Sequence, residues 1–194
     1  MKKLVVIAAT CALFGSATAA LAAGDAAAGK AKSATCAACH NADGNSANPQ
    51  YPKLAGQGEG YLLKQLQDYK SGARVNAIMA GMVAPLSPQD MEDLSAYYAS
   101  QQIARGAADP ALAPVGEAIF RGGNLNSGVS ACMACHGPNG AGIPAAKFPA
   151  IAAQHAEYTE LQLKAFRAME RANDAGQMMR SIASKMTDAE IKAV

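Results

Sequence analysis

Two short runs of cysteine and histidine have a spacing that permits a specific chemistry. They read Cys36-Ala37-Ala38-Cys39-His40 and Cys132-Met133-Ala134-Cys135-His136. Two thiols three positions apart on a turn of helix can each bond a vinyl-derived carbon of one porphyrin, and the adjoining histidine then falls under the iron. The pattern predicts two covalently attached c-type haems. The first is held by Cys36, Cys39 and His40, and the second by Cys132, Cys135 and His136.

Three other chemistries use cysteine pairs. Two Cys-x-x-Cys knuckles could bind zinc, one pair could act as a redox dithiol, and four cysteines could form disulfides in an oxidising compartment. Each of these leaves the histidine that follows both pairs without a role. Haem attachment explains that histidine in both places and is the interpretation adopted.

An internal duplication pairs the two motifs. With an offset of 96 positions, Cys36, Cys39 and His40 align with Cys132, Cys135 and His136. With an offset of 97, Pro52, Gln57, Tyr61, Gln65, Leu66, Arg74 and Asn76 align with Pro149, Gln154, Tyr158, Gln162, Leu163, Arg171 and Asn173. We therefore predict two domains, at 23–100 and 115–194, joined by a linker at 101–114.

The same alignment selects candidates for the sixth iron ligand. With an offset of 100, Met79 aligns with Met179. In contrast, Met82, Met91, Met178 and Met186 align with Ile182, Ile191, Ile78 and Leu86. Exchange between apolar residues indicates packing, whereas a thioether kept in both copies indicates a need for sulfur. Because Met opposite His is an electron-transfer ligand pair, we predict Met79 and Met179 as ligands, with Met82 and Met178 as the nearest alternatives.

Two positions near the motifs invite a role in the site. Pro52 and Pro149 lie between each motif and the next predicted helix. Each proline either makes a rigid turn or supplies a backbone carbonyl that accepts the ring proton of His40 or His136. The third histidine, His155, aligns with a glycine, so we expect it to be a loop or surface residue rather than an iron ligand.

Both copies have helical periodicity, and nothing alternates like a strand. Helices are expected at 25–35 and 113–121, ahead of the motifs, and at 61–69 and 158–166 after them. Ser87 before Pro88 is a typical N-cap, so a further helix should run to about Ser100. Residues 41–58 are rich in turn formers and predict a loop. Since Val194 aligns with Leu94, we expect the last helix of the second copy to be cut short.

The composition favours a small core around each haem. Of the 194 residues, 51% are hydrophobic but only 5% are aromatic, and tryptophan is absent. Copies of about 80 to 90 residues bury a limited part of their surface, so a porphyrin would supply the missing core. The predicted fold class is all-α, with two tandem domains that each wrap around one haem.

The first 22 residues are organised like a secretory signal peptide, with Lys2 and Lys3 before an apolar run at 4–14 and Ala20-Leu21-Ala22 at its end. We predict that this leader is cleaved and the protein exported to the periplasm; a retained anchor is the alternative, since 4–24 carries no charge. Without the two lysines, 15 basic residues face 15 acidic ones. Such a balance gives no support to nucleic-acid binding.

Taken together, these residues resemble the dihaem cytochrome c4 family along the mature length. The resemblance rests on both Cys-x-x-Cys-His motifs, on 51–57, 61–66 and Met79-Ala80-Gly81-Met82, and on their second-copy counterparts. It implies two cytochrome c-like domains with His40 and Met79 on one iron and His136 and Met179 on the other. It also implies an exported electron carrier, not an enzyme, with redox partners such as a quinol–cytochrome c reductase and a terminal oxidase, and with peripheral membrane association as an option.

A dihaem peroxidase is the alternative function from another class. It requires one iron with an open or displaceable site. A distal methionine in both copies favours the carrier, because the thioether closes each iron against peroxide.

Overall fold

The computed structural model describes residues 24–194, so the predicted leader lies outside the described residues. Within this range the chain is helical, with two isolated β-bridges and no β-strand. The first half contains α1 (Ala26–Lys32), α2 (Ala34–His40), α3 (Glu59–Ser71), α4 (Ala77–Val83) and α5 (Pro88–Ala99). The all-α prediction is confirmed.

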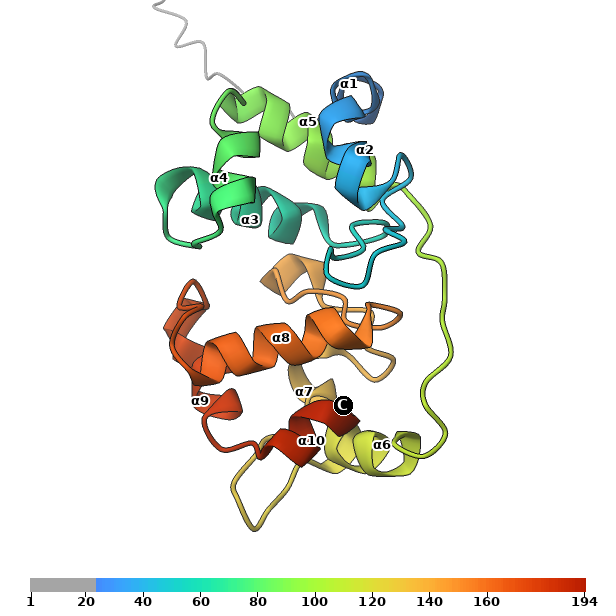
Figure 1. The fold of residues 1–194 in the computed structure, drawn as a ribbon, viewed down its shortest axis with the longest axis vertical. Helices are drawn as coiled ribbons and strands as arrows, with labels where there is room; N and C mark the ends of the chain where they lie inside the picture. Colours follow the sequence, from blue (N-terminus) through green and yellow to red (C-terminus); the bar gives the residue numbers. More distant parts are fainter. Residues whose placement is uncertain (1–23) are drawn as a thin grey trace, which may run out of the picture.

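The second half repeats this order, with α6 longer than α1 and the other four helices shorter than their counterparts. It contains α6 (Ala113–Gly122), α7 (Met133–His136), α8 (Ala156–Arg167), α9 (Met178–Ala183) and α10 (Asp188–Ala193). Two turns of 3₁₀-helix, η1 (Pro144–Ala146) and η2 (Ala175–Gln177), precede α8 and α9. The two halves lie one above the other, with α3 and α8 facing each other across the middle (Figure 1). An extended segment between α5 and α6 runs along one side of the molecule (Figure 1).

In each half the first helix crosses the last one at a glycine. A Cβ atom on Gly29 of α1 would lie 2.0 Å from the Asp93 carbonyl oxygen of α5. In the second half, a Cβ atom on Gly116 of α6 would lie 1.9 Å from the Ala193 carbonyl oxygen of α10. Only a residue without a side chain permits such an approach, so both crossings depend on glycine.

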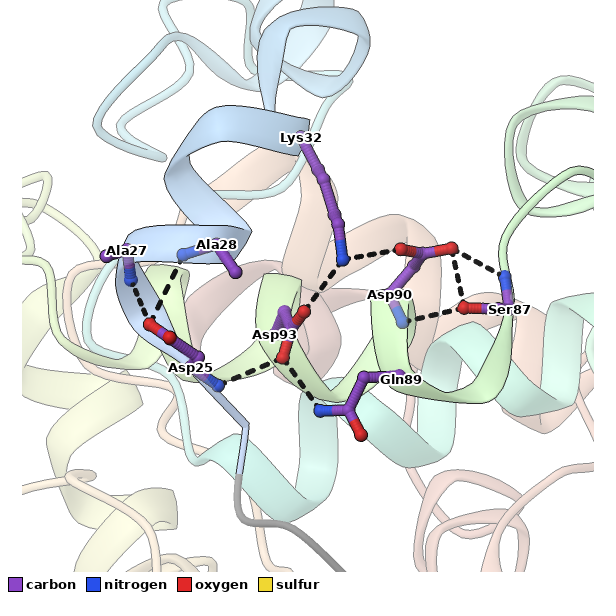
Figure 2. Close-up of polar contacts among 8 residues, drawn as sticks. All are labelled: Asp25, Ala27, Ala28, Lys32, Ser87, Gln89, Asp90 and Asp93. Atoms are coloured by element: carbon purple, nitrogen blue, oxygen red, sulfur yellow. Dashed lines mark hydrogen bonds and ion pairs between the residues drawn. The ribbon is translucent and has the colours of Figure 1, made fainter.

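Polar contacts fasten α1 to α5 in the first half (Figure 2). The Lys32 ammonium lies 2.6 Å from Asp90 and 2.8 Å from Asp93. Asp93 also accepts hydrogen bonds from the Asp25 backbone N–H and from the Gln89 side chain. Because Asp93 is only 3% exposed, these donors replace the water that its carboxylate loses.

The helix predicted from Ser87 to about Ser100 is confirmed. Ser87 forms a capping box with Asp90, in which each side chain accepts a hydrogen bond from the other residue's backbone N–H. The helix expected at 25–35 is instead divided at Ser33, whose hydroxyl donates to the Lys30 carbonyl at 2.8 Å. As a result, the first motif lies on a separate short helix, α2.

Two small cores lie in the two halves. The first contains Leu62, Leu94, Tyr97 and Tyr98, and the second contains Ile119, Val129, Leu163, Met186 and Ile191. Neither is large for a half of this length, as the low aromatic content predicts. Among residues 24–194, no helix has the length and apolar character needed to cross a membrane.

Candidate haem sites

The first motif occupies the end of α2. Cys36 and Cys39 are half-buried thiols three positions apart on this helix, and His40 is its last residue, with an exposed fraction of 7%. Helical spacing of three places side chains on one face. The two thiols and the imidazole therefore leave the same short element next to one another.

The second motif has the same arrangement on a shorter helix. Cys132 caps α7, Cys135 follows within it, and His136 ends it with an exposed fraction of 7%. Both cysteines are half-buried. The local geometry of the motif thus repeats, although α7 has four residues and α2 has seven.

A proline carbonyl holds the ring of each motif histidine. The Nδ1 atom of His40 lies 2.9 Å from the Pro52 oxygen, and that of His136 lies 2.8 Å from the Pro149 oxygen. A carbonyl oxygen can only accept, so Nδ1 carries the proton and donates in both rings. The accepting carbonyl, one of the two roles considered for the prolines, is present in both halves.

This tautomer leaves the other ring nitrogen available as a ligand. Burial lowers the pKa of His40 and of His136, against the opposite effect of the proline carbonyl, so both rings are neutral at pH 7. Neither Nε2 atom makes a hydrogen bond with a residue that the structure describes. A buried neutral imidazole with Nδ1 held and Nε2 bearing a lone pair is suited to bind a metal ion.

The competing cysteine chemistries find little support in this geometry. None of the four motif cysteines forms a disulfide with another residue that the structure describes. Burial raises the pKa of Cys36 and of Cys132, which disfavours the thiolate that redox catalysis uses. No group of three or more His, Cys, Asp or Glu side chains is arranged to hold a metal ion within residues 24–194.

The two predicted methionine ligands lie in the first turns of matching helices. Met79 lies in α4, where its N–H donates to the capping Asn76 side chain at 3.0 Å, and α4 packs on α3. Met179 lies in α9, packs against the second core and is half-buried. No contact in the structure joins either sulfur to a motif histidine, so their role as ligands stays a prediction.

The other methionines separate into two environments. Met91 and Met186 are core residues, each with an exposed fraction of 4%. Met82 and Met178, the nearest alternatives for the ligand, are 47% and 40% exposed. The alignment placed all four opposite Ile or Leu, and only two of them are buried packing residues.

A polar cluster with two buried arginines joins the halves. Arg74 donates to Gln65 of its own half and, across the interface, to Tyr158 and Gln162, each at 2.8 Å. Arg171 makes the reciprocal set, donating to Gln162 at 2.9 Å, to Tyr61 at 3.0 Å and to Gln65 at 3.1 Å. The internal alignment pairs all of these residues, but the sequence alone assigned them no role. The signal that could have found them is that the same polar residue types occur at the same positions in both copies.

The arginine cluster is relevant to the fit of haem. Arg74 and Arg171 are 7% and 8% exposed, yet neither has a carboxylate within ion-pair distance in the described part of the chain. Uncompensated buried charge is costly. Each haem carries anionic propionates, so two buried cations without an acidic partner suit a protein that holds two haems.

His155 is a loop residue, one of the two settings expected for it, and it lies at the interface between the halves. It caps α8 and is half-buried, and its Nε2 atom lies 2.9 Å from the Ser46 carbonyl oxygen of the other half. The sequence did not predict this contact, because Ser46 lies 109 positions away and the first copy has a glycine in place of His155. Its exclusion as an iron ligand agrees with this separate hydrogen bond.

Two motif-bearing helical halves with buried, ligand-ready histidines define a protein of the cytochrome c class. The family model described as Cytochrome c matches residues 26–102 and again 116–194. Cytochrome c4 of Pseudomonas aeruginosa is 53% identical over 174 residues, covering 89% of this chain and 87% of that protein. The chain belongs to the cytochrome c4 family.

Two further comparisons agree with this membership. The crystal structure of reduced recombinant cytochrome c4 from Pseudomonas stutzeri superposes with a TM-score of 0.86 at 52% identity, covering 88% of this chain and 95% of that one. A thiosulfate dehydrogenase electron acceptor of Thiomonas intermedia is 40% identical over 171 residues, covering 84% of this chain and 76% of that protein.

These findings establish the broad function. The chain is an electron-transfer cytochrome with two c-type haems, and it is not an enzyme. Its cofactor attachment pairs fit the Cys-x-x-Cys-His pattern in both matched segments. The comparisons give no support to the peroxidase alternative.

Proposed function

We propose that the protein is a periplasmic electron shuttle with two six-coordinate haems. His40 and Met79 bind the first iron, and His136 and Met179 bind the second. Cys36 and Cys39 attach the first porphyrin and Cys132 and Cys135 the second. Residues 1–22 are a cleaved leader, and 23–100 and 115–194 are the two haem domains, with 101–114 between them.

The observation that carries this proposal is the repeated histidine geometry. In both halves a buried imidazole donates its Nδ1 proton to a proline carbonyl at 2.8 to 2.9 Å, with two thiols on the same short helix. Haem supplies a one-electron couple when bound. The chain's own residues hold the ring in one tautomer, attach the macrocycle and supply a soft sulfur that favours ferrous iron.

The proposed partners are other redox proteins. A quinol–cytochrome c reductase as donor and a terminal oxidase as acceptor suit a carrier with no bond chemistry of its own. The relative named as an electron acceptor of thiosulfate dehydrogenase supports a second donor, an enzyme that oxidises thiosulfate. Comparing how fast each purified donor reduces the oxidised protein separates the two. Peripheral association with the membrane surface would bring the protein close to such membrane-bound partners.

Carbon monoxide binding separates the carrier from the peroxidase. The reduced protein with both irons closed should bind carbon monoxide slowly or not at all, because each methionine occupies the sixth position. Rapid binding at one haem would overturn the carrier assignment. Intact mass on the same preparation should show a chain that starts near Ala23 and carries two haems; a retained segment 1–14 would revive the anchor.

A further inference from the structure

A buried glutamine of the first half binds the backbone of the second half next to its haem motif. Gln57, 7% exposed, accepts a hydrogen bond from the Ala150 N–H at 2.8 Å and donates to the Ala150 carbonyl at 2.8 Å. Its oxygen also accepts from the N–H of Gly58 in its own half at 2.9 Å. One side chain thus satisfies both backbone groups of a residue 93 positions away.

The second half returns the same contact. Gln154, which the internal alignment pairs with Gln57, accepts from the Lys53 N–H at 2.8 Å and donates to the Lys53 carbonyl at 3.0 Å. Its oxygen likewise accepts from the N–H of the next residue, His155, at 3.0 Å. Lys53 and Ala150 also occupy one column of the alignment. The two glutamines therefore form a reciprocal pair, each bound to the other half.

The contacted N–H groups belong to the peptide units that hold the motif histidines. The Ala150 N–H and the Pro149 carbonyl are the two ends of one planar peptide unit. That carbonyl accepts from His136 at 2.8 Å. A continuous series of hydrogen bonds therefore runs from the ring of His136, through one peptide unit, to the side-chain oxygen of Gln57.

The corresponding series in the other direction joins the same kinds of groups. The His40 ring donates to the Pro52 carbonyl at 2.9 Å, and the N–H of the same peptide unit, on Lys53, donates to Gln154 at 2.8 Å. Each motif histidine is thus linked by hydrogen bonds to a glutamine of the opposite half.

Hydrogen bonds in series polarise one another. When the peptide N–H donates to glutamine, more negative charge collects on the proline carbonyl, and the bond from the histidine ring becomes stronger. A stronger bond at Nδ1 makes the imidazole a more basic ligand, and a more basic ligand favours ferric over ferrous iron. Loss of the glutamine oxygen should therefore raise the reduction potential of the haem in the other half.

We propose that Gln57 and Gln154 are positioning residues that tune, in a crossed manner, the reduction potential of the haem in the opposite half. This inference rests on the proposed ligand roles of His40 and His136. It gives each haem a dependence on the contact between the halves. A change in that contact then reaches the iron through three hydrogen-bonded groups rather than through movement of the backbone as a whole.

The test is a redox titration of the two-haem protein with Gln57→Leu and Gln154→Leu, followed by NMR signals of haem methyl groups assigned to each half. Gln57→Leu should raise the potential of the second haem and leave the first unchanged. Gln154→Leu should do the opposite. In the reduced Gln57→Leu protein, the Nδ1 proton signal of His136 should move to lower chemical shift, as expected for a weaker hydrogen bond.

Two further variants separate tuning from loosening of the interface. Asn173→Ala removes contacts of 2.9 Å to Gln65 and 2.5 Å to Asp68 across the interface but touches neither proline peptide, so it should produce no crossed shift. With its carboxyl protonated, the Gln57→Glu side chain keeps both contacts with Ala150 and should leave the second potential near its unmodified value; ionised, it is a stronger acceptor and should lower that potential. Leu and Glu variants that shift it in the same direction would overturn the proposal.

The remaining outcomes are also decisive. Equal shifts at both haems in Gln57→Leu, or no shift in a protein with both haems in place, would contradict the crossed link. If the Leu variant does not retain two haems, Gln57→Asn, which is one methylene too short to reach Ala150, answers the same question. Failure of the histidine ligand assignment would be seen differently, as the absence of paramagnetically shifted ring-proton signals of His40 and His136 in the oxidised, unmodified protein.

Discussion

Each half of the molecule contains a neutral histidine, buried and fixed by a proline carbonyl, beside two half-buried cysteines. The bond at Nδ1 selects the tautomer, and burial keeps the ring uncharged. A ring prepared in this way loses little freedom when Nε2 binds iron. The predicted haem attachment and histidine ligation of this cytochrome c4 family member therefore depend on residues within 17 positions of each first motif cysteine, Cys36 to Pro52 and Cys132 to Pro149, whereas the predicted methionine ligands lie farther along the chain.

Methionine exposure leads to a prediction on stability. Met91→Ala should lower the free energy of unfolding by about 2–5 kcal/mol, because it leaves a cavity at a core position. Met82→Ala should change it by only about 0.5 kcal/mol, because that side chain is 47% exposed. Urea unfolding of the two variants, followed by helical circular dichroism, makes the comparison. Equal losses of stability in the two variants would contradict the assignment of Met82 as an exposed residue that contributes little to packing.

The residues of the motifs could be predicted because their spacing is local. The proline carbonyl could also be proposed, since it keeps one place in both copies. The contacts of His155 and of the two glutamines could not, because each partner lies about 93 to 109 positions away. Repetition of a polar residue in both copies indicates a structural or functional role, but only the three-dimensional structure shows which backbone group that residue binds.

At the scale of elements, the crossing of α1 and α5 is held by charge as well as by packing. Asp93 has a pKa lowered to about 2, first by the Lys32 hydrogen bond and then by the Asp25 backbone N–H and Gln89. The pKa of Asp90 is lowered for the same main reason, its hydrogen bond with Lys32. Ionised carboxylates at these two positions therefore join the N-terminal helix to the last helix of the half.

This arrangement predicts acid sensitivity of the first half. A carboxylate with a lowered pKa contributes stability above its unfolded pKa of about 3.8, and this contribution is lost as the pH falls towards 2. The free energy of unfolding should thus fall more steeply between pH 4 and 2 in the unmodified protein than in Asp93→Asn. Urea unfolding across this range provides the measurement.

A neighbouring carboxylate on α5 serves as the control. Glu92 makes no ion pair among the described residues, so Glu92→Gln should keep the steep fall. If Asp93→Asn and the unmodified protein lose stability in parallel, the ion pairs with Lys32 do not contribute to acid sensitivity.

Element boundaries could be predicted where a local signal existed. Ser87 and Pro88 identify the start of α5, because capping involves residues within one turn. The break between α1 and α2 could not be predicted from helix propensity, because 25–32 is rich in helix-forming Ala and Lys. At Ser33 the hydroxyl donates to the Lys30 carbonyl, a local contact of the kind that competes with continuation of a helix.

At the scale of the whole molecule, the two halves meet through hydrogen bonds and buried arginines rather than through an apolar face. Arg74 and Arg171 each reach across to a tyrosine and a glutamine of the other half. The internal repeat predicted two similar units. It could not predict that α3 and α8 would face each other, because the repeat alone does not specify how the copies are placed.

Balanced charge predicts how docking depends on salt. Residues 23–105 carry seven basic and seven acidic side chains, and 106–194 carry eight of each. Net charge therefore cannot steer encounters with a partner, and only local patches could do so. The rate of electron transfer to a redox partner protein should change modestly between low and physiological ionic strength. A steep fall in stopped-flow rates over that range would reveal a dominant charged patch.

The central claim, two haems each closed by one methionine, is tested most directly by the far-red sulfur-to-iron charge-transfer band of the oxidised protein. Met79→Ala and Met179→Ala should each remove about half of this band and open one haem to carbon monoxide, because each supplies one sulfur ligand. Met82→Ala and Met178→Ala should leave the band intact. Survival of the full band in Met79→Ala together with its loss in Met82→Ala would contradict the account for the first haem, and the same comparison of Met179 with Met178 decides the second.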